Sequence, residues 1–201
     1  MGARSLNVHA FMPQSRSNGP GERAVLWVQG CSLRCKGCSN PGTHSFEPKH
    51  LLSVDAVFDR MRSLSPDVEG MTLTGGEPFD QAGSLVSLLQ RVKEETLWSV
   101  LVFTGYELME VLDQGPEQRK FLQYIDVLVA GRYDPSLRCR KPLRASSNQS
   151  LHFLTDRYGE EDCQNVPDAE VVISEEGIVT LTGVHPPSLK GFSWMDEERA
   201  S

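Results

Sequence analysis

Segments with the composition of buried β-strands alternate with amphipathic helical patterns through the first two thirds of the chain. The strand-like segments are short and rich in β-branched and aliphatic residues: Ala24–Gln29, Met71–Thr74, Ser99–Phe103 and Ile125–Ala130. Helical spacing predicts one helix capped by Ser53 and ended by Pro66, a second opened by Asp80 or Gln81, and a helical stretch from Glu107. This alternation is typical of βαβ units and predicts a parallel sheet.

The loops of unusual composition all follow predicted strands. Three clustered cysteines follow the first strand, and the later strands are followed by Gly75-Gly76-Glu77-Pro78, Thr104-Gly105 and Gly131-Arg132. Functional groups of parallel α/β sheets gather at the carboxyl ends of the strands, so we expect these loops to form one active site. The βα units are too few for a closed barrel of eight. The predicted fold is therefore α/β, an incomplete (β/α) barrel with a parallel sheet, open on one side.

Both ends of the chain differ from this alternating region. Residues 1–22 are rich in Gly, Pro, Ser and Asn, which predicts a loop or loose N-terminal arm. Strand-like pieces follow position 150, at Leu151–Leu154, Glu170–Ser174 and Ile178–Thr182. Glu175-Glu176-Gly177 joins the last two as a predicted hairpin turn. From His185 the sequence is rich in Pro and acidic residues, which predicts a loose end.

These patterns predict a core domain over residues 1–150 and a small β-hairpin extension over residues 151–201, packed on the core or trailing from it. The chain has 201 residues and a net charge of −7, which argues against a general nucleic-acid-binding protein. The charge is uneven, because eleven acidic and three basic residues follow position 150. Such an acidic tail either binds a partner or is a solvated surface.

No apolar run is long enough to span a membrane, and the N-terminus lacks the apolar core of a secretory signal. We therefore expect a cytoplasmic protein with no membrane partner. The segment Arg132–Arg144, with Pro135 and Pro142, is predicted to be a loop, and it is basic, with Arg138, Arg140 and Lys141. It either binds an acidic partner or a phosphate-bearing substrate, or is neutralised by the chain's own acidic tail.

Three of the five cysteines fall within eight residues, in the pattern CxxxCxxC formed by Cys31, Cys35 and Cys38. Thiolates are soft ligands that suit iron–sulfur clusters and zinc. Three ligands on a [4Fe–4S] cluster leave one iron open, and an open position is typical of a catalytic metal site. Two alternatives remain at this point. Zinc would take the three cysteines and His44, and a closed electron-transfer cluster would take Cys139 or Cys163 as its fourth ligand.

CxxxCxxC directly after a strand resembles the signature of the radical S-adenosylmethionine superfamily, and Met71–Pro78 (MTLTGGEP) resembles its glycine-rich cofactor loop. Further stretches resemble the activating proteins of anaerobic ribonucleotide reductase and the related activases of glycyl radical enzymes. These stretches are Asn18–Arg23, Leu26–Cys31, Cys38–Asn40, Ile125–Tyr133 and Ser146–Gln149. The resemblance covers about residues 18–150 and implies a [4Fe–4S] cluster and S-adenosylmethionine as cofactors.

The resemblance also implies roles for individual residues. The metal ligands would be Cys31, Cys35 and Cys38, and the cofactor-binding residues would be Gly37, Cys38, Ser39, Asn40, Gly75, Gly76, Glu77 and Pro78. The amino and carboxylate groups of S-adenosylmethionine would chelate the open iron. Glu77 would accept from the ammonium group, the two glycines would let the backbone approach the ligand, and Pro78 would fix the turn.

Around the third cysteine, Gly37, Cys38 and Ser39 would offer backbone groups to the adenosine. Many superfamily members carry an aromatic residue where this chain has Gly37, so the adenine must find its stacking surface elsewhere. Asn40 either orders the cluster loop or forms a local Asx turn. No catalytic acid–base set is predicted, because the cofactors carry the chemistry.

The implied activity is reductive cleavage of S-adenosylmethionine to a 5′-deoxyadenosyl radical, which abstracts hydrogen from a glycine of a partner glycyl radical enzyme. An external electron donor such as flavodoxin or ferredoxin is expected. One alternative is a radical enzyme of the same branch that modifies a peptide or small molecule. An alternative of another class is a non-catalytic zinc or electron-transfer module. The extension would recognise a different partner or cover the open side of the barrel.

Overall fold

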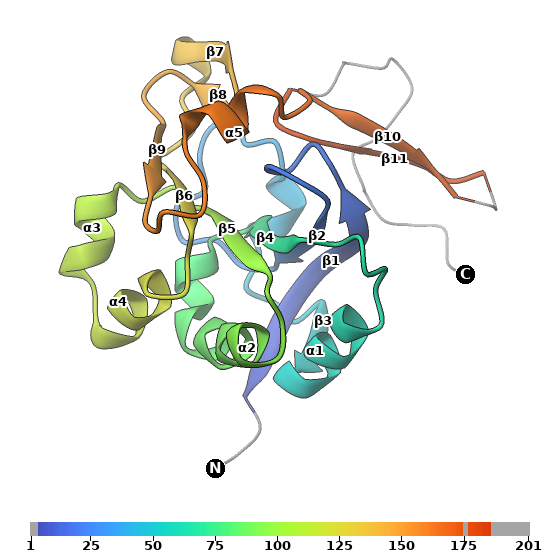
Figure 1. Ribbon diagram of the computed structural model, residues 1–201. Coiled ribbons are helices and arrows are strands. Elements are labelled where there is room, and N and C mark those ends of the chain that lie inside the picture. The colour runs from blue at the N-terminus through green and yellow to red at the C-terminus, as the bar shows by residue number, and fades with distance from the viewer. Residues whose placement is uncertain (1–3, 175–176, 186–201) are drawn as a thin grey trace.

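The computed structural model describes residues 4–174 and 177–185. Its centre is a seven-stranded sheet in the order β3-β1-β2-β4-β5-β6-β9 (Figure 1). The strands are β1 Ser5–Ser15, β2 Arg23–Val28, β3 His50–Ser53, β4 Gly70–Gly75, β5 Ser99–Phe103, β6 Val127–Ala130 and β9 Ser150–Phe153. The four central strands, β2, β4, β5 and β6, are parallel, and β1, β3 and β9 pair with their neighbours antiparallel.

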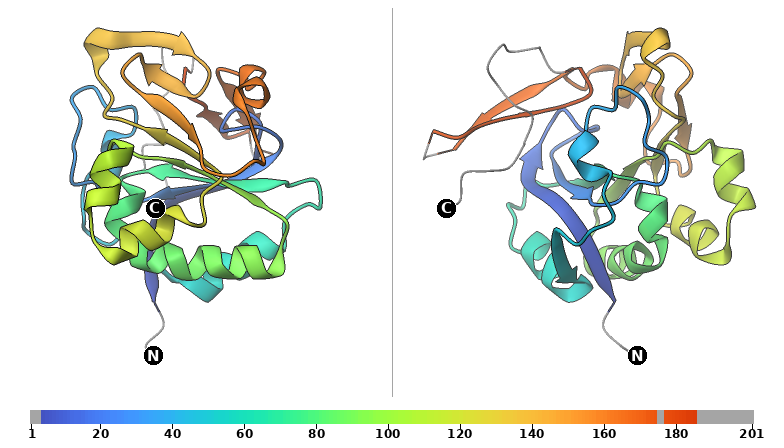
Figure 2. Two further views of the ribbon diagram at one scale, coloured as in Figure 1. Left: turned by 60° about the vertical axis from the view of Figure 1, so that its left-hand side comes forward. Right: turned by 180° about the vertical axis from the view of Figure 1, so that it is seen from behind.

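Helices cover one face of this sheet, and short hairpins cover part of the other face (Figure 2). The helical face carries α1 Val54–Arg62, α2 Ala82–Glu95, α3 Leu108–Asp113 and α4 Pro116–Leu122. The opposite side carries the hairpin of β7 Arg138–Lys141 and β8 Arg144–Ser146, the short helix α5 Glu160–Gln164, and the hairpin of β10 Glu170–Ile173 and β11 Val179–Thr182. Three 3₁₀ turns complete the fold: Pro41–Thr43, Pro78–Gln81 and Pro135–Leu137.

Successive side chains of a strand point to opposite faces of the sheet, so the apolar residues of the central strands are shared between these two layers. In β5, Val100 and Val102 join the core beneath the helices, whereas Leu101 joins a second cluster with Leu143 and Cys163. Because both faces are covered, these strands read as continuous apolar runs rather than alternating ones. The strands predicted over Met71–Thr74 and Ser99–Phe103 are confirmed. They could be predicted because such apolar runs are typical of covered strands.

The predictions for the N-terminal arm and the basic loop are wrong in part. Residues 5–15 of the predicted arm form β1, which lies between β2 and β3, with a register shift between Met12 and Ser15 that spans Pro13. The segment Arg132–Arg144 is not a loop throughout, because it contains β7 and the start of β8. Composition rich in turn residues led to both errors, and pairing with distant strands overrides that local preference.

The sheet is open in the described part of the chain, with β3 and β9 as its end strands, and the barrel expectation is not confirmed. After position 150, β9 extends the main sheet beside β6, and β10 and β11 form the expected antiparallel hairpin. The predicted turn residues Glu175 and Glu176, and the predicted loose end after His185, lie outside the described residues. Among the residues described, no helix combines the length and apolar character needed to cross a membrane.

Arg23 is a fully buried cation at the start of β2, at the end of the sheet away from the cysteine loop. Within the described ranges, its guanidinium donates to neutral oxygens, including Thr72 Oγ1 at 2.9 Å, Ser99 Oγ at 2.8 Å and the Met71 carbonyl at 2.7 Å. Burial lowers its pKa. Arg23 therefore ties β2 to β4 and β5, which gives the segment Asn18–Arg23 a structural role.

Asp126, directly before β6, connects α2, β5 and the segment after β9. Its Oδ2 accepts from Lys93 Nζ and from the Val100 amide, both at 2.7 Å, and its Oδ1 accepts from Thr155 Oγ1 at 2.8 Å. Burial works to raise the pKa of Asp126, but these hydrogen bonds hold it below its ordinary value. The carboxylate therefore stabilises the fold above its unfolded pKa, and that contribution is lost as the pH falls through the folded pKa.

We expect Asp126→Asn to lower the free energy of unfolding at neutral pH by about 2 kcal/mol, because an amide donor then faces Lys93 and Val100. The difference from wild type should shrink below about pH 4, where the wild-type carboxyl also becomes protonated. Urea unfolding at neutral and acidic pH measures both effects. Asp113→Asn, at an exposed position on α3, is the matched control. An equal loss in that control, or a difference independent of pH, would contradict this account of Asp126.

Candidate active site

A cavity of about 260 Å³ lies at the carboxyl ends of the parallel strands. The loops after all four strands contribute to its lining. They supply Cys31, Cys35 and Cys38 after β2, Gly75, Gly76 and Glu77 after β4, Thr104 and Gly105 after β5, and Gly131 and Tyr133 after β6. The structure therefore brings together the loops that the sequence places after its strands.

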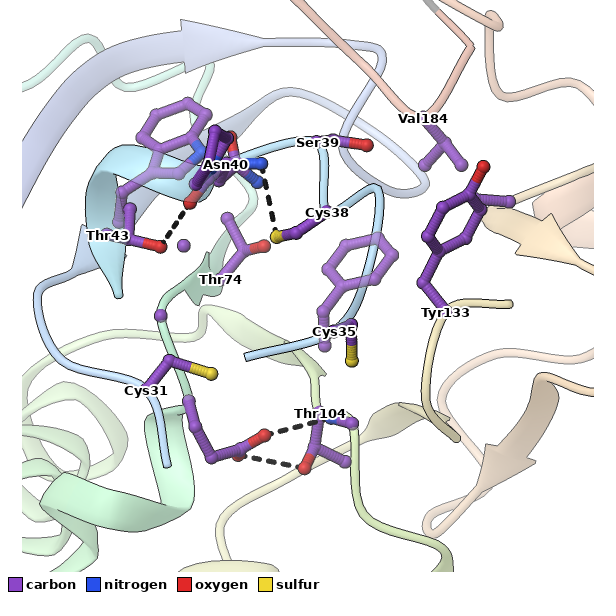
Figure 3. A pocket seen from close by; sticks show the side chains of 18 of the residues that line it. Cys31, Cys35, Cys38, Ser39, Asn40, Thr43, Thr74, Thr104, Tyr133 and Val184 are labelled. Carbon is purple, nitrogen blue, oxygen red and sulfur yellow. Dashed lines mark hydrogen bonds between the residues drawn. The ribbon is translucent and has the colours of Figure 1, made fainter. Parts of the chain in front are cut away.

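The three cysteine sulfurs border the same open space in this cavity (Figure 3). Cys31 is buried, and Cys35 and Cys38 are half-buried. Backbone bonds hold the two ends of the loop together, from the Gly30 amide to the Thr43 carbonyl at 2.8 Å and from the Cys31 amide to the His44 carbonyl at 3.4 Å. A loop closed in this way holds its three thiols on one side of the cavity.

Burial raises the pKa of the Cys31 and Cys38 thiols. The amide of Asn40, which lies 3.3 Å from Cys38 Sγ, offsets this effect only in part. A cation at the site is therefore needed to keep these groups as thiolates, and bound metal ions do this for coordinating thiols. The donor set fits a metal centre that is rich in positive charge.

The candidate metal centres differ in how many metal ions the thiolates bind. Within residues 4–174 and 177–185, no three His, Cys, Asp or Glu side chains converge closely enough to hold a single ion. A zinc site would bring the three cysteines and His44 onto one ion, whereas in a [4Fe–4S] cluster each thiolate binds a different iron. Cys139 and Cys163 are absent from the cavity lining, so neither is placed as a fourth ligand. The three thiols therefore fit a cluster with one open iron.

The Gly-Gly-Glu-Pro loop contacts the residues that lead into the cysteine loop. The Gly76 amide donates to the Val28 carbonyl at 2.8 Å, and the Glu77 amide donates to the Gly30 carbonyl at 2.9 Å. A Cβ atom at Gly76 would lie 2.1 Å from the Gly30 oxygen, so no other residue fits there. Gly75 and Gly76 both line the cavity, and their small size is also required by this packing between the two loops.

Glu77 is almost fully buried at the edge of the cavity. Its Oε1 accepts from the Phe79 amide at 3.0 Å and from Thr104 Oγ1 at 2.8 Å, and its Oε2 accepts from the Gly105 amide at 2.9 Å (Figure 3). Burial raises the pKa of Glu77 to about 7, although these hydrogen bonds favour the charged form. Pro78 begins the 3₁₀ turn behind Glu77 and is buried, outside the cavity lining.

The remaining predicted residues lie around the third cysteine. Ser39 and Asn40 line the cavity, whereas Gly37 is exposed and lies behind it, with a left-handed φ of 72°. The Asn40 carbonyl accepts from the amide of Thr43 at 3.0 Å and from its Oγ1 at 2.7 Å. The Asn40 side chain makes no capping bond, so Asn40 orders the loop through its backbone rather than through an Asx turn.

Comparison with known proteins agrees with this geometry. The family described as "4Fe-4S single cluster domain" matches residues 17–152. The anaerobic ribonucleoside-triphosphate reductase-activating protein of Enterobacteria phage T4 is 33% identical over 164 residues, which cover 78% of this chain and 100% of that protein. The protein of the same name from Vibrio cholerae is 35% identical over 164 residues, covering 75% of this chain and 99% of that protein.

The chain belongs to the family of anaerobic ribonucleoside-triphosphate reductase-activating proteins. It is a radical S-adenosylmethionine enzyme, and its cofactors are a [4Fe–4S] cluster and S-adenosylmethionine. The solved structure of QueE from Escherichia coli aligns with 50% of this chain and 53% of its own, with 17% identity and a TM-score of 0.40. That likeness is too low to support an argument.

Several residues of this activase site were not singled out from the sequence. Thr74 is the penultimate residue of β4, where the rule that sites gather at strand ends would have found it. Thr104 is expected at the site from its place after a strand, but its hydrogen bond to Glu77 is not. Tyr133 and the segment 181–184 also line the cavity. The segment 181–184 has no local signal, because its place in the cavity depends on long-range packing of the extension.

We expect Cys35→Ala to lose the cluster, since two thiolates cannot replace the three ligands that the loop supplies. Wild-type protein prepared without oxygen should contain about four iron and four sulfide per chain, and the variant should contain neither above background. Cys139→Ala, at a cysteine outside the cavity, is the matched control and should load normally. A fully loaded Cys35→Ala protein, or zinc in place of iron in the wild type, would refute the ligand assignment.

Proposed function

We propose that this protein installs a glycyl radical on an anaerobic ribonucleotide reductase. The observation that carries the proposal is the cavity in which three thiols of one loop lie beside buried Glu77. Full-length coverage of relatives named as activating proteins of that reductase supports the choice of substrate. The open sheet leaves access for a protein substrate.

The proposed division of labour assigns metal binding to Cys31, Cys35 and Cys38 and cofactor positioning to the loops opposite them. The three thiolates would hold a cluster that supplies the electron for reductive cleavage of S-adenosylmethionine, and the chemistry so supplied would be hydrogen abstraction from the substrate glycine. The chain's own residues bind, orient and enclose these groups. No side chain is required to transfer a proton, and the proposed catalytic set contains no acid or base.

Glu77 is proposed to accept a hydrogen bond from the N–H of the S-adenosylmethionine amino group. Among the described residues, its Oε1 accepts from two donors, whereas its Oε2 accepts from the Gly105 amide alone. A carboxylate oxygen has two acceptor lone pairs, so Oε2 keeps one for a ligand. Thr104 and Gly105 hold the carboxylate in place, so little entropy is lost when the amino group binds.

The activity is tested by mixing the reduced protein, S-adenosylmethionine and the candidate reductase without oxygen. We expect an organic radical signal by electron paramagnetic resonance, with 5′-deoxyadenosine formed in step with it. A reductase whose radical glycine is replaced by alanine is the control and should give no such signal. Formation of 5′-deoxyadenosine without the glycyl signal would instead support the alternative of a peptide or small-molecule substrate.

An electron donor is proposed to dock on basic residues around the cysteine loop. We define this basic surface as Arg34, Lys36, Arg138, Arg140 and Lys141, all of which are exposed. Gly37 packs against Tyr133 and Pro135, which joins the cysteine loop to the segment that leads into β7. None of the five forms an ion pair with a carboxylate within residues 4–174 and 177–185. An acidic one-electron carrier of the flavodoxin or ferredoxin class matches this charge.

We expect the double variant Arg138→Glu, Arg140→Glu to slow cluster reduction by an acidic flavodoxin about fivefold at low ionic strength, because rim charges set the association rate. Stopped-flow absorbance of the cluster measures this rate. Reduction by dithionite should be unchanged, and Lys120→Glu, a single charge reversal at an exposed position on α4, is the control. Equal slowing in Lys120→Glu, or no loss of the difference at high salt, would contradict docking at the basic surface.

A further inference from the structure

One side of the active-site cavity differs in character from the side that carries the cysteines and Glu77. The cavity lining there includes the ring of Tyr133 and the side chain of Val184, and Leu143 and Leu181 also line the cavity. Figure 3 shows Tyr133 and Val184 on the same side of the cavity. Leu181 and Val184 lie beyond residue 152, where the match to the family ends. The C-terminal extension and the part of the chain that matches the family therefore both line this cavity.

Buried polar contacts fix this part of the extension to the core. Asn18 Nδ2 donates to Thr182 Oγ1 at 2.8 Å and to Ser15 Oγ at 2.8 Å, and Ser15 Oγ donates to Glu170 Oε2 at 2.7 Å. Asn18, Thr182 and Ser15 are all buried. Val184 also packs against the apolar cluster on the face of β5 and β6 opposite the helices. Residues 181–184 are thus a fixed wall of the cavity.

Tyr133 lies against Gly37 of the cysteine loop. A Cβ atom at Gly37 would lie 3.6 Å from Tyr133 Cε1 and 3.7 Å from the Pro135 ring, which are ordinary van der Waals distances. The tyrosine ring therefore packs next to this position of the cysteine loop. With glycine there, the aromatic surface next to the third cysteine comes from the loop after β6.

These two sides of the cavity match the two ends of S-adenosylmethionine. Its methionine end carries an amino group and a carboxylate, which suit the open iron and Glu77. Its adenine is uncharged and flat, and aromatic and aliphatic side chains bind such a base by stacking and burial. We propose that Tyr133, together with residues 181–184 of the extension, forms the adenine-binding wall. This inference rests on the proposed function, because it assumes that S-adenosylmethionine occupies the cavity.

The test measures the binding of two separate fragments, 5′-deoxyadenosine and L-methionine, to the cluster-loaded protein by equilibrium dialysis without oxygen. Stacking of one base on one aromatic ring predicts that Tyr133→Ala weakens 5′-deoxyadenosine binding about tenfold and changes L-methionine binding less than about twofold. Tyr133→Phe keeps the ring and is the matched control, with both affinities close to wild type. Glu77→Gln should give the opposite pattern, with weaker L-methionine binding.

Val184→Ser is the second variant, and it tests the extension without changing Tyr133. It should weaken 5′-deoxyadenosine binding about threefold, since less apolar surface is buried against the base, and should leave cluster content unchanged. If Tyr133→Ala does not load its cluster, this variant alone decides the question. Loss of both fragments together in a loaded variant, or unchanged nucleoside binding, would overturn the inference.

The wild-type result separates this inference from the proposed function. If the loaded wild type binds neither fragment nor S-adenosylmethionine, the proposed function fails. If the wild type binds all three and the Tyr133 and Val184 variants match it, only the adenine-binding wall is overturned.

Discussion

Two backbone hydrogen bonds connect the metal-binding half of the site to its cofactor-binding half. Parallel pairing of β2 with β4 brings Val28 opposite Gly75, and the Gly76 and Glu77 amides then donate to the Val28 and Gly30 carbonyls. Glycine at position 76 is what allows the two loops to approach so closely. Because Cys31 directly follows Gly30, this contact fixes where the cysteine loop starts relative to the Glu77 carboxylate.

The parallel centre of the fold could be predicted from the sequence because covered strands carry continuous apolar runs. The edges could not be predicted in the same way. Strand β1 contains Pro13 and polar residues, and it is a strand because β2 and β3 pair with its two sides. The small hairpin of β7 and β8 sits in a basic segment with two prolines, where local composition favours a loop. Pairing between distant segments decides both cases.

The candidate site also has some residues that could be predicted from the sequence and others that could not. The cysteines and the Gly-Gly-Glu-Pro loop could be found from the sequence because each is a short motif after a strand. Thr104 and Tyr133 act through neighbours from other loops, Thr104 by donating to Glu77 and Tyr133 by packing over Gly37. The wall at 181–184 depends on the bond from Asn18 to Thr182 across 164 positions of the chain. Such contacts leave no periodic or motif signal.

The central claim is that three thiolates hold a cluster with one iron open to S-adenosylmethionine. Electron paramagnetic resonance of the reduced, cluster-loaded protein tests this most directly, with spectra recorded before and after S-adenosylmethionine is added in the absence of any reductase. Direct binding of the cofactor's amino and carboxylate groups to the open iron predicts a clear change in the g-values of the cluster. An unchanged spectrum at cofactor concentrations that saturate the protein would contradict the claim.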